Sequence, residues 1–161
     1  MNDIAAKIID ILRERKLTLG TVESATGGLI AHLLTGIPGC SDVFRGSIVS
    51  YSNDIKTNLA GVKTATLEKY GAVSSQVAAE MAAGGRKALG ADICVADTGI
   101  AGPGGATAGK PVGLFYLGLS TKEGTVAQKH LFTGSRDENK QQAAQTALQR
   151  VLDYLKKLPL G

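Results

Sequence analysis

Tryptophan is absent from this sequence of 161 residues, and aromatic residues make up only 4% of it. The hydrophobic fraction is nevertheless 43% and the charged fraction 20%, which is typical of a globular protein and not of a disordered one. A core with so few rings must be built from alanine, valine, isoleucine and leucine. The length suits one domain with a substantial core and is short for two, so we expect residues 1–161 to form a single domain.

Cysteine is also scarce, with only Cys40 and Cys94 in the chain. Neither has a CxxC partner or a histidine at metal-ligand spacing, so no metal site is predicted. We expect two free thiols, each buried or half-buried, in the reducing environment of the cytoplasm. The first residues carry Asp3 and a broken apolar pattern instead of a signal peptide. No apolar run approaches the roughly 18 residues of a membrane span, so we expect no contact with a membrane.

Long runs of positive charge are missing as well. The net charge is +4, but no four consecutive residues are lysine or arginine, and the basic residues lie among acids. Nucleic acid is therefore not an expected partner, whereas a small anionic substrate would be attracted. The two histidines, His32 and His130, have no Cys, His or Asp partner at matching spacing, so no Ser-His-Asp set can be assembled. If a serine is catalytic here, a lysine is the favoured base.

Apolar periodicity divides the chain into alternating helices and strands. Helical spacing predicts helices over 3–15 with Asn2 or Asp3 as cap, Thr26–Thr35, Asn53–Asn58 with Asn53 as cap, 64–70, 75–89 capped by Ser74 or Ser75, and 136–157. Extended segments are predicted over 19–24, 43–51, 91–98, 112–120 and 125–132, the last two joined as an antiparallel hairpin. This order predicts an α/β fold, a three-layer α/β/α sandwich around a mixed, mostly parallel sheet with an antiparallel hairpin.

Ligands in such sheets bind beyond the carboxyl ends of strands, where two loops are expected, Ser24–Gly28 and Gly99–Gly109. The first belongs to the segment TVESATGG, which presents Ser24 between a strand and a helix. Such a junction aims free backbone N–H groups at the hydroxyl, as a nucleophile with an oxyanion hole requires. The expected donors are the N–H groups around Thr26, Gly27 and Gly28. A serine before a helix is also an ordinary N-cap, and the pattern alone leaves both interpretations open.

Tyr51 and Lys56 form a second candidate group, in the segment YSNDIK. Lysine acts as a general base when burial or a neighbouring cation lowers its pKa. Near Ser24 it could accept the hydroxyl proton, while the tyrosine relays that proton or holds the lysine in place. The alternative is an aromatic residue at a strand end followed by a solvated helix lysine.

The glycine-rich loop after residues 91–98 is the third candidate. Its backbone N–H groups could bind a phosphate or carboxylate, or its glycines could serve only its turns. The loop matches neither of two known nucleotide-binding motifs. Gly104 to Lys110 matches part of a P-loop, but Pro111 follows where serine or threonine is required. A dinucleotide fingerprint that begins at Gly102 would need a third glycine where Thr107 stands.

The fourth candidate is Arg136, at the start of the last predicted helix in the segment GSRDENK. A helix N-terminus favours anions, so Arg136 could clamp a phosphate there. The alternative is a surface arginine that pairs with neighbouring acids.

Taken together and in this order, these segments resemble the nicotinamide-nucleotide amidases (NMN deamidases), also called the CinA C-terminal-domain family. The matching stretches are TVESATGG, GSIVSYSNDIKTNLAGV, GAVSSQVAAEMAAGGRKALGADICVADTGIAGPGG, KPVGLFYLGLS and FTGSR. They cover nearly the whole chain, and their joint occurrence is far more specific than any one of them.

The resemblance implies hydrolysis of the carboxamide of nicotinamide mononucleotide to nicotinate mononucleotide and ammonia, with no cofactor and no metal. In the family the serine of the first motif is the nucleophile, and the tyrosine and lysine of the second assist it. By position these are Ser24, Tyr51 and Lys56. The resemblance also implies a three-layer α/β/α sandwich that is usually a homo-oligomer. Our candidates for holding ribose and phosphate are Thr98, Gly102, Gly104, Lys110 and Arg136.

The sequence departs from the family pattern in two places. Ala25 stands where members often have cysteine, and Lys140 stands where they often have a second arginine. Lysine keeps the charge but loses the bidentate fork, which would weaken a phosphate site. A domain often precedes this one in longer relatives, and its activity is not expected here.

Two other functions are compatible with these residues. The same pocket could bind a nucleotide without turning it over, as a sensor or as a partner of another protein. It could also be the site of a serine–lysine amidase that acts on a peptide or lactam. Ammonia release distinguishes the first alternative from an amidase, and competition by inorganic phosphate distinguishes the second.

Overall fold

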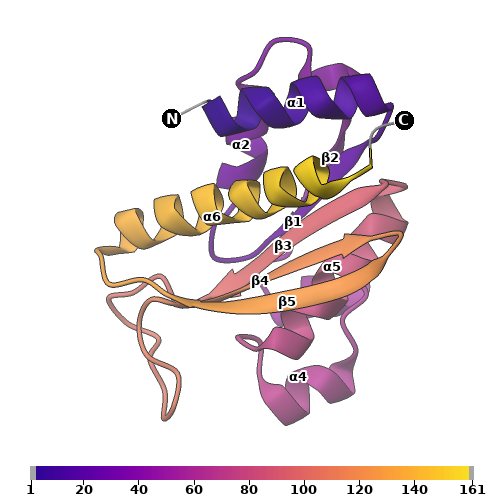
Figure 1. Cartoon of the computed structure of the whole chain (residues 1–161). Helices are drawn as coiled ribbons and strands as arrows, with labels where there is room; N and C mark the ends of the chain where they lie inside the picture. Colours follow the sequence, from indigo (N-terminus) through magenta and orange to yellow (C-terminus); the bar gives the residue numbers. More distant parts are fainter. Residues whose placement is uncertain (1–2, 160–161) are drawn as a thin grey trace.

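The computed structural model describes residues 3–159 (Figure 1). The helices are α1 (Asp3–Arg15), α2 (Leu29–Thr35), α3 (Asn53–Asn58), α4 (Thr64–Tyr70), α5 (Ser75–Leu89) and α6 (Arg136–Lys157), with a 3-10 turn η1 (Cys40–Asp42). The strands are β1 (Leu19–Glu23), β2 (Phe44–Val49), β3 (Ile93–Gly99), β4 (Leu114–Thr121) and β5 (Gly124–Leu131). Every predicted element is present. The helix bounds match the prediction except at the start of α2, which lies three residues later, and most strand ends shift by one or two residues. Asn2, one of the two predicted caps of α1, lies outside the described residues.

The five strands form one sheet in the order β2-β1-β3-β4-β5. Strand β1 pairs in parallel with both β2 and β3, and the β3–β4 and β4–β5 pairs are antiparallel. The mixed sheet with its antiparallel hairpin is therefore confirmed. Because β1 lies between two parallel neighbours, the loops that follow β1, β2 and β3 meet at one edge of the sheet.

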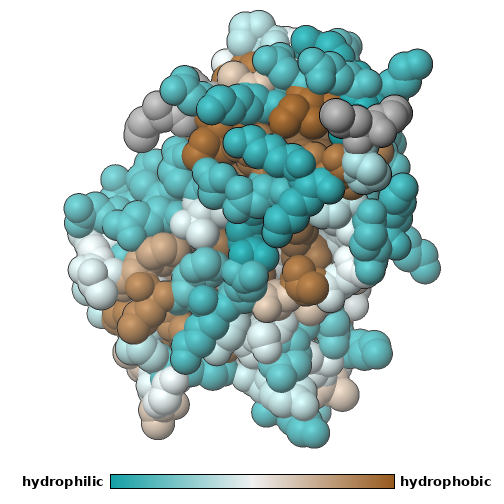
Figure 2. All heavy atoms as spheres, in the orientation of Figure 1, coloured by the Kyte–Doolittle hydropathy of each residue, from teal (hydrophilic) through white to brown (hydrophobic). Residues whose placement is uncertain are grey.

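Helices cover both faces of the sheet, which confirms the three layers (Figure 1). Helices α1, α2 and α6 lie on one face, and their apolar side chains share a core with Leu19, Val95 and Leu117 from the sheet. Helix α5 covers the other face, with α4 beside it, and a second cluster joins Met81 to Val22. Figure 2 shows hydrophobic surface in the seam between α1 and α6, with hydrophilic residues over much of the outward side of these helices.

Small residues let α5 lie directly against the sheet. A Cβ on Gly85 would stand 2.1 Å from Val22 Cγ2, and one on Gly118 of β4 would stand 2.3 Å from the carbonyl oxygen of Ala78. Neither position has room for a side chain, so helix and sheet approach at backbone distance.

Two helix starts differ from the prediction. The cap of α3 is Ser52, whose side chain accepts the N–H of Ile55, and not Asn53, which is the first helical residue. Helix α2 begins at Leu29, because residues 24–28 form turns in which Gly27 and Gly28 have φ of 63° and 104°. The cap of α5 is Ser74, one of the two predicted residues.

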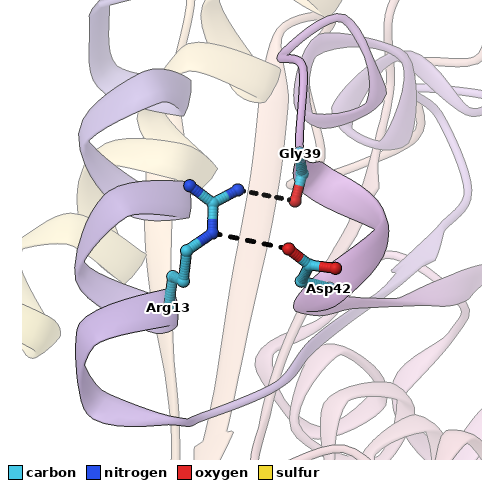
Figure 3. Close-up of polar contacts among 3 residues, drawn as sticks. All are labelled: Arg13, Gly39 and Asp42. Atoms are coloured by element: carbon cyan, nitrogen blue, oxygen red, sulfur yellow. Dashed lines mark hydrogen bonds and ion pairs between the residues drawn. The ribbon is translucent and has the colours of Figure 1, made fainter.

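Contacts between α1 and the turn at residues 39–42 join two surface segments. Arg13 on α1 donates a hydrogen bond of 2.9 Å to the carbonyl oxygen of Gly39 and lies 3.6 Å from a carboxylate oxygen of Asp42 (Figure 3). Both side chains are exposed, so the ion pair contributes at most about 1 kcal/mol.

The two cysteines are free thiols, as predicted: Cys40 is half-buried and Cys94 is buried. Within residues 3–159, no helix combines the length and the apolar character needed to cross a bilayer.

Candidate active site

Ser24 and Lys56 meet where β1 ends. The Lys56 Nζ lies 2.9 Å from the Ser24 Oγ, and the two residues are only 2% and 7% exposed. The same Nζ donates to the carbonyl oxygens of Ser50, at 2.8 Å, and Tyr51, at 3.1 Å. A neutral amine has two N–H groups and one lone pair. If the two carbonyls accept the two N–H groups, the lone pair faces the serine hydroxyl, which is the arrangement of a general base.

The local sequence explains why this lysine points inward. Ser52 caps α3, and Lys56 follows one turn later, so its side chain leans back toward the end of β2. Burial lowers the pKa of Lys56 below that of an ordinary lysine, and the nearby Asp97 carboxylate partly opposes this shift. The expected lysine–serine pair therefore lies in an environment that favours the neutral amine.

Tyr51 contributes to the site mainly through its main chain. Its carbonyl oxygen accepts from Lys56, while its side chain is 62% exposed at the mouth of the pocket. Among residues 3–159, no hydrogen bond joins its phenol to Ser24 or Lys56. A role for the phenol in proton transfer stays a prediction.

The expected oxyanion donors are already engaged within the protein. The N–H of Thr26 donates to Asp97 Oδ2 at 3.1 Å, that of Gly27 to the carbonyl oxygen of Ser24, and that of Gly28 to Glu23 Oε1. These three groups therefore do not point freely at the hydroxyl, contrary to expectation. The turn at 24–28 directs those of Thr26 and Gly28 toward buried carboxylates and that of Gly27 toward a main-chain carbonyl oxygen.

The N–H of Ala25 has no partner among the described residues, and Ala25 lines the pocket next to Ser24. The residue after a nucleophile is a common source of an oxyanion donor. Ala25 was noted in the sequence only as a departure from the family pattern.

Two buried carboxylates, Glu23 and Asp97, were missed by the sequence reasoning. Both are 0% exposed. Glu23 accepts the N–H groups of Gly28, Ile30 and Ala31 and so caps the start of α2. Asp97 accepts the N–H of Ser24 at 3.0 Å and fixes the turn that carries this serine. The available signal was an acid inside each otherwise apolar or β-branched strand.

A pocket of about 190 Å³ opens over Ser24 and Lys56. It is lined by Ser24, Ala25, Tyr51, Asn53, Lys56, Ala72, Val73, Thr98, Gly99, Ala101 and Arg136. Of the expected ribose and phosphate residues, Thr98 and Arg136 are in the lining, whereas Gly102, Gly104 and Lys110 are not. Thr98 donates its hydroxyl to the carbonyl oxygen of Ala72 at 2.8 Å, which joins β3 to the loop before α5.

Arg136 reaches the pocket from the start of α6. Its Nη1 donates to the carbonyl oxygen of Gly102 at 2.8 Å, so Gly102 contacts the arginine and not the cavity. Ser135 and Glu138 form a capping box that defines where this helix begins. The Lys140 Nζ lies 3.8 Å from where a Cβ on Gly27 would stand, so two cations border the Ser24 turn from α6. This arrangement can attract an anionic group.

Lys110 and Gly104 lie on the loop between β3 and β4, which projects away from the sheet (Figure 1). The Lys110 Nζ donates to the carbonyl oxygen of Tyr70 at 2.6 Å, and a Cβ on Gly104 would meet nothing within 4 Å. Within residues 3–159, no group of three or more His, Cys, Asp or Glu side chains could hold a metal ion.

Known proteins resemble this chain over nearly its whole length. Residues 1–155 match the family described as the CinA C-terminal domain. A CinA-like protein of Leptospira borgpetersenii is 47% identical over 156 residues, which cover 96% of this chain and 37% of that protein. A CinA-like protein of Thermotoga maritima is 43% identical, over 92% of this chain and 36% of its own length. The chain thus spans less than two fifths of these relatives.

Solved structures show the same fold. The crystal structure of the competence/damage inducible protein CihA from Agrobacterium tumefaciens superposes with a TM-score of 0.93 at 40% identity, over 97% of this chain and 95% of that one. A CinA superfamily protein from Klebsiella pneumoniae gives a TM-score of 0.93 at 29% identity, over 98% of both chains.

Proposed function

This chain belongs to the CinA C-terminal domain family, and we propose that it hydrolyses the carboxamide of nicotinamide mononucleotide to nicotinate mononucleotide and ammonia. The observation that carries this proposal is the 2.9 Å contact between the Ser24 hydroxyl and the buried Lys56 amine. A lysine in such a place costs stability unless it is neutral or fully paired, so its burial supports a chemical role.

In the first step neutral Lys56 takes the proton of the Ser24 hydroxyl. The oxygen attacks the carboxamide carbon, a carbon–oxygen bond forms, and the carbonyl π electrons move to the amide oxygen. The N–H of Ala25 donates to this oxyanion, and one such donor stabilises the transition state by roughly 3 kcal/mol. This assignment replaces the Thr26, Gly27 and Gly28 donors, whose N–H groups bind Asp97, Ser24 and Glu23.

In the second step the Lys56 ammonium returns its proton to the amide nitrogen. The carbon–nitrogen bond breaks, ammonia leaves, and Ser24 carries the nicotinoyl ester. Lys56, neutral again, then takes a proton from water, whose oxygen attacks the ester carbon. The bond from this carbon to the Ser24 oxygen breaks, Lys56 returns the proton to that oxygen, and the acid leaves. The exposed Tyr51 lines the pocket, and in this proposal its phenol covers the pyridine ring.

Arg136 and Lys140 provide the positive border for the substrate phosphate, and Thr98 lines the same cavity. Gly102 supports Arg136 through its carbonyl oxygen. Lys110 and Gly104 lie outside the pocket and would reach substrate only if their loop moved toward it. A homo-oligomer, a cytoplasmic setting and a single domain over residues 1–161 remain part of the same proposal.

The test is ammonia release from nicotinamide mononucleotide by the wild-type protein and by Ser24→Ala. We expect release by the wild type and background by the variant, with retained binding of the mononucleotide by calorimetry. Lys7→Met, an exposed change on α1, is the control for a surface substitution. Turnover by Ser24→Ala at the wild-type rate would contradict the proposal. Wild-type binding without ammonia would instead favour a nucleotide-binding module.

A second arm addresses the substrate class. Simple amides, peptides and a lactam are tested beside nicotinamide mononucleotide, each with and without inorganic phosphate. Phosphate competition against the mononucleotide supports an anion-binding pocket. Faster turnover of a neutral amide, unaffected by phosphate, would indicate the alternative serine–lysine amidase.

A further inference from the structure

Thr26 lies between the two buried carboxylates behind the nucleophile. Its hydroxyl oxygen is 2.8 Å from Glu23 Oε1 and within hydrogen-bond distance of Asp97 Oδ1. Thr26 is 1% exposed and both acids are 0% exposed, so water does not separate the three groups. Among the described residues, no lysine, arginine or histidine forms a salt bridge with either acid.

The hydrogen bonds of Thr26 determine how many protons the three side chains hold. A threonine hydroxyl has one proton and can donate it to only one of the two carboxylates. The other contact is favourable only if that carboxyl group carries a proton and donates it to the threonine oxygen. Two adjacent buried carboxylates that form no salt bridge also resist double ionisation, and burial together with the charge of Glu23 raises the pKa of Asp97. The three side chains therefore hold one proton beyond that of the hydroxyl.

The backbone decides which acid holds it. Glu23 accepts three N–H groups from the start of α2, where the helix favours an anion. Asp97 accepts two, from Ser24 and Thr26. Burial raises the pKa of Asp97 to about 6, in agreement with this assignment. The proton chain then runs from Asp97 through Thr26 to Glu23.

We propose that Asp97 is a positioning residue which shares one proton with Glu23 through Thr26 and thereby sets the charge of Lys56. Asp97 Oδ1 binds the Ser24 N–H at 3.0 Å, and Lys56 binds the hydroxyl of the same serine. When Asp97 is ionised, its charge favours the Lys56 ammonium, which cannot act as a base. When Asp97 holds the proton, Lys56 is more readily neutral. The consequence for catalysis rests on the proposed function.

Other charged groups near the pair lie on neighbouring elements. Arg136 of α6 lines the pocket, Lys140 of α6 borders the Gly27 turn, and Tyr51 lines the pocket beside Lys56. On α5, Glu80 is bound to Lys63 and Thr66 and so faces away from the pair. Burial lowers the pKa of Lys56, and the Asp97 carboxylate raises it against that effect. Changing Asp97 therefore tests the pair itself.

The experiment measures the pKa of Lys56 directly in the free protein. Lysine labelled at Cε and Nζ is titrated by NMR in the wild type, Asp97→Asn and Asp10→Asn, with the Lys56 signal assigned by its loss in Lys56→Met. Asp97→Asn removes the negative charge permanently, so we expect a Lys56 pKa lower by about one unit. Asp10→Asn makes the same change of net charge at an exposed position on α1 and should leave the pKa unchanged.

The pH dependence of ammonia release is measured for the same variants. The acid limb of kcat/KM should move to lower pH in Asp97→Asn by the shift that NMR reports, with kcat on the plateau changed less than kcat/KM on the limb. An unchanged or raised Lys56 pKa in folded Asp97→Asn overturns the inference. If the wild type releases no ammonia, the proposed function fails, while the NMR result still decides the inference.

A second pair of variants applies if Asp97→Asn does not fold. Thr26→Val removes the hydroxyl that links the acids, so Asp97 loses a hydrogen bond to its anion and retains its proton to higher pH. Thr26→Ser keeps the link. We expect a lower Lys56 pKa in Thr26→Val than in Thr26→Ser, and equal values overturn the inference.

Discussion

The end of β1 and the loop between β3 and β4 are both placed to meet a ligand, but they are built in different ways. At the end of β1, Ser24, Lys56 and Asp97 are buried, and each of these polar side chains has hydrogen-bond partners. In the loop, a Cβ on Gly104 would meet nothing within 4 Å, and Lys110 donates to the carbonyl oxygen of Tyr70 at the end of α4. The hydrogen bonds at the end of β1 hold its charged groups in place, so this region can set a pKa. The loop between β3 and β4 has few such contacts. Changes at the first should alter chemistry, and changes at the second should have small effects.

The largest effect is expected from Lys56→Met. If Lys56 is the base, its loss should reduce kcat/KM by about 10³-fold to 10⁶-fold, as happens when serine hydrolases lose a member of the catalytic set. Folding should not suffer, because an apolar chain of similar length replaces a buried amine. Ammonia release and thermal unfolding measure the two effects, with Lys7→Met as control. A tenfold loss or less would mean that Lys56 is structural.

The pH dependence of stability should show the burial of Asp97. Its pKa in the folded protein is about 6, above the ordinary value of 3.8. The protonated form therefore stabilises the fold fully below pH 3.8, and this contribution is lost as pH rises through about 6. Urea unfolding should give a wild-type advantage over Asp97→Asn that falls by about 2 kcal/mol between pH 4 and pH 7. A constant difference would contradict the raised pKa.

A pair of glycine substitutions compares how stability depends on the contact between α5 and the sheet and on the loop between β3 and β4. Gly118→Ala places a Cβ 2.3 Å from the Ala78 carbonyl oxygen, whereas Gly104→Ala meets nothing within 4 Å. We expect Gly118→Ala to lower the free energy of unfolding by about 2 kcal/mol or more, because helix and sheet must separate. Gly104→Ala should change it by less than about 0.5 kcal/mol. Denaturant unfolding compares the two, and similar values would indicate that α5 is loosely packed.

The smallest effects concern substrate affinity. Arg136→Met should raise KM for nicotinamide mononucleotide about tenfold or more, because a charge-assisted contact is worth about 1.5 kcal/mol or more. Lys110→Met should change KM less than about threefold, since Lys110 is outside the pocket lining. Steady-state kinetics at constant ionic strength make the comparison. A larger effect from Lys110 would mean that its loop closes over the substrate.

Local patterns were sufficient for most of the fold. Apolar spacing identified each helix and strand, the short turn at Lys122–Gly124 indicated the hairpin, and Ser74 was recognisable as a cap. The predicted start of α2, Thr26, lies three residues before the observed one. The Glu23 carboxylate accepts the free N–H groups of Gly28, Ile30 and Ala31 and so sets where the helix begins. A carboxylate that caps a helix from a buried strand has no signature in helical periodicity.

The sequence by itself determined the three layers, the element order and the segments that could carry chemistry, because these depend on contacts between near neighbours in the chain. Only the tertiary structure decided which groups meet. It brings Lys56 to Ser24 across 32 positions and Asp97 to the same serine across 73, and it keeps Lys110 outside the pocket. The physical reason is that hydrogen-bond partners and burial, which set the charge of an amine or a carboxyl group, depend on distances between strands that no local pattern encodes.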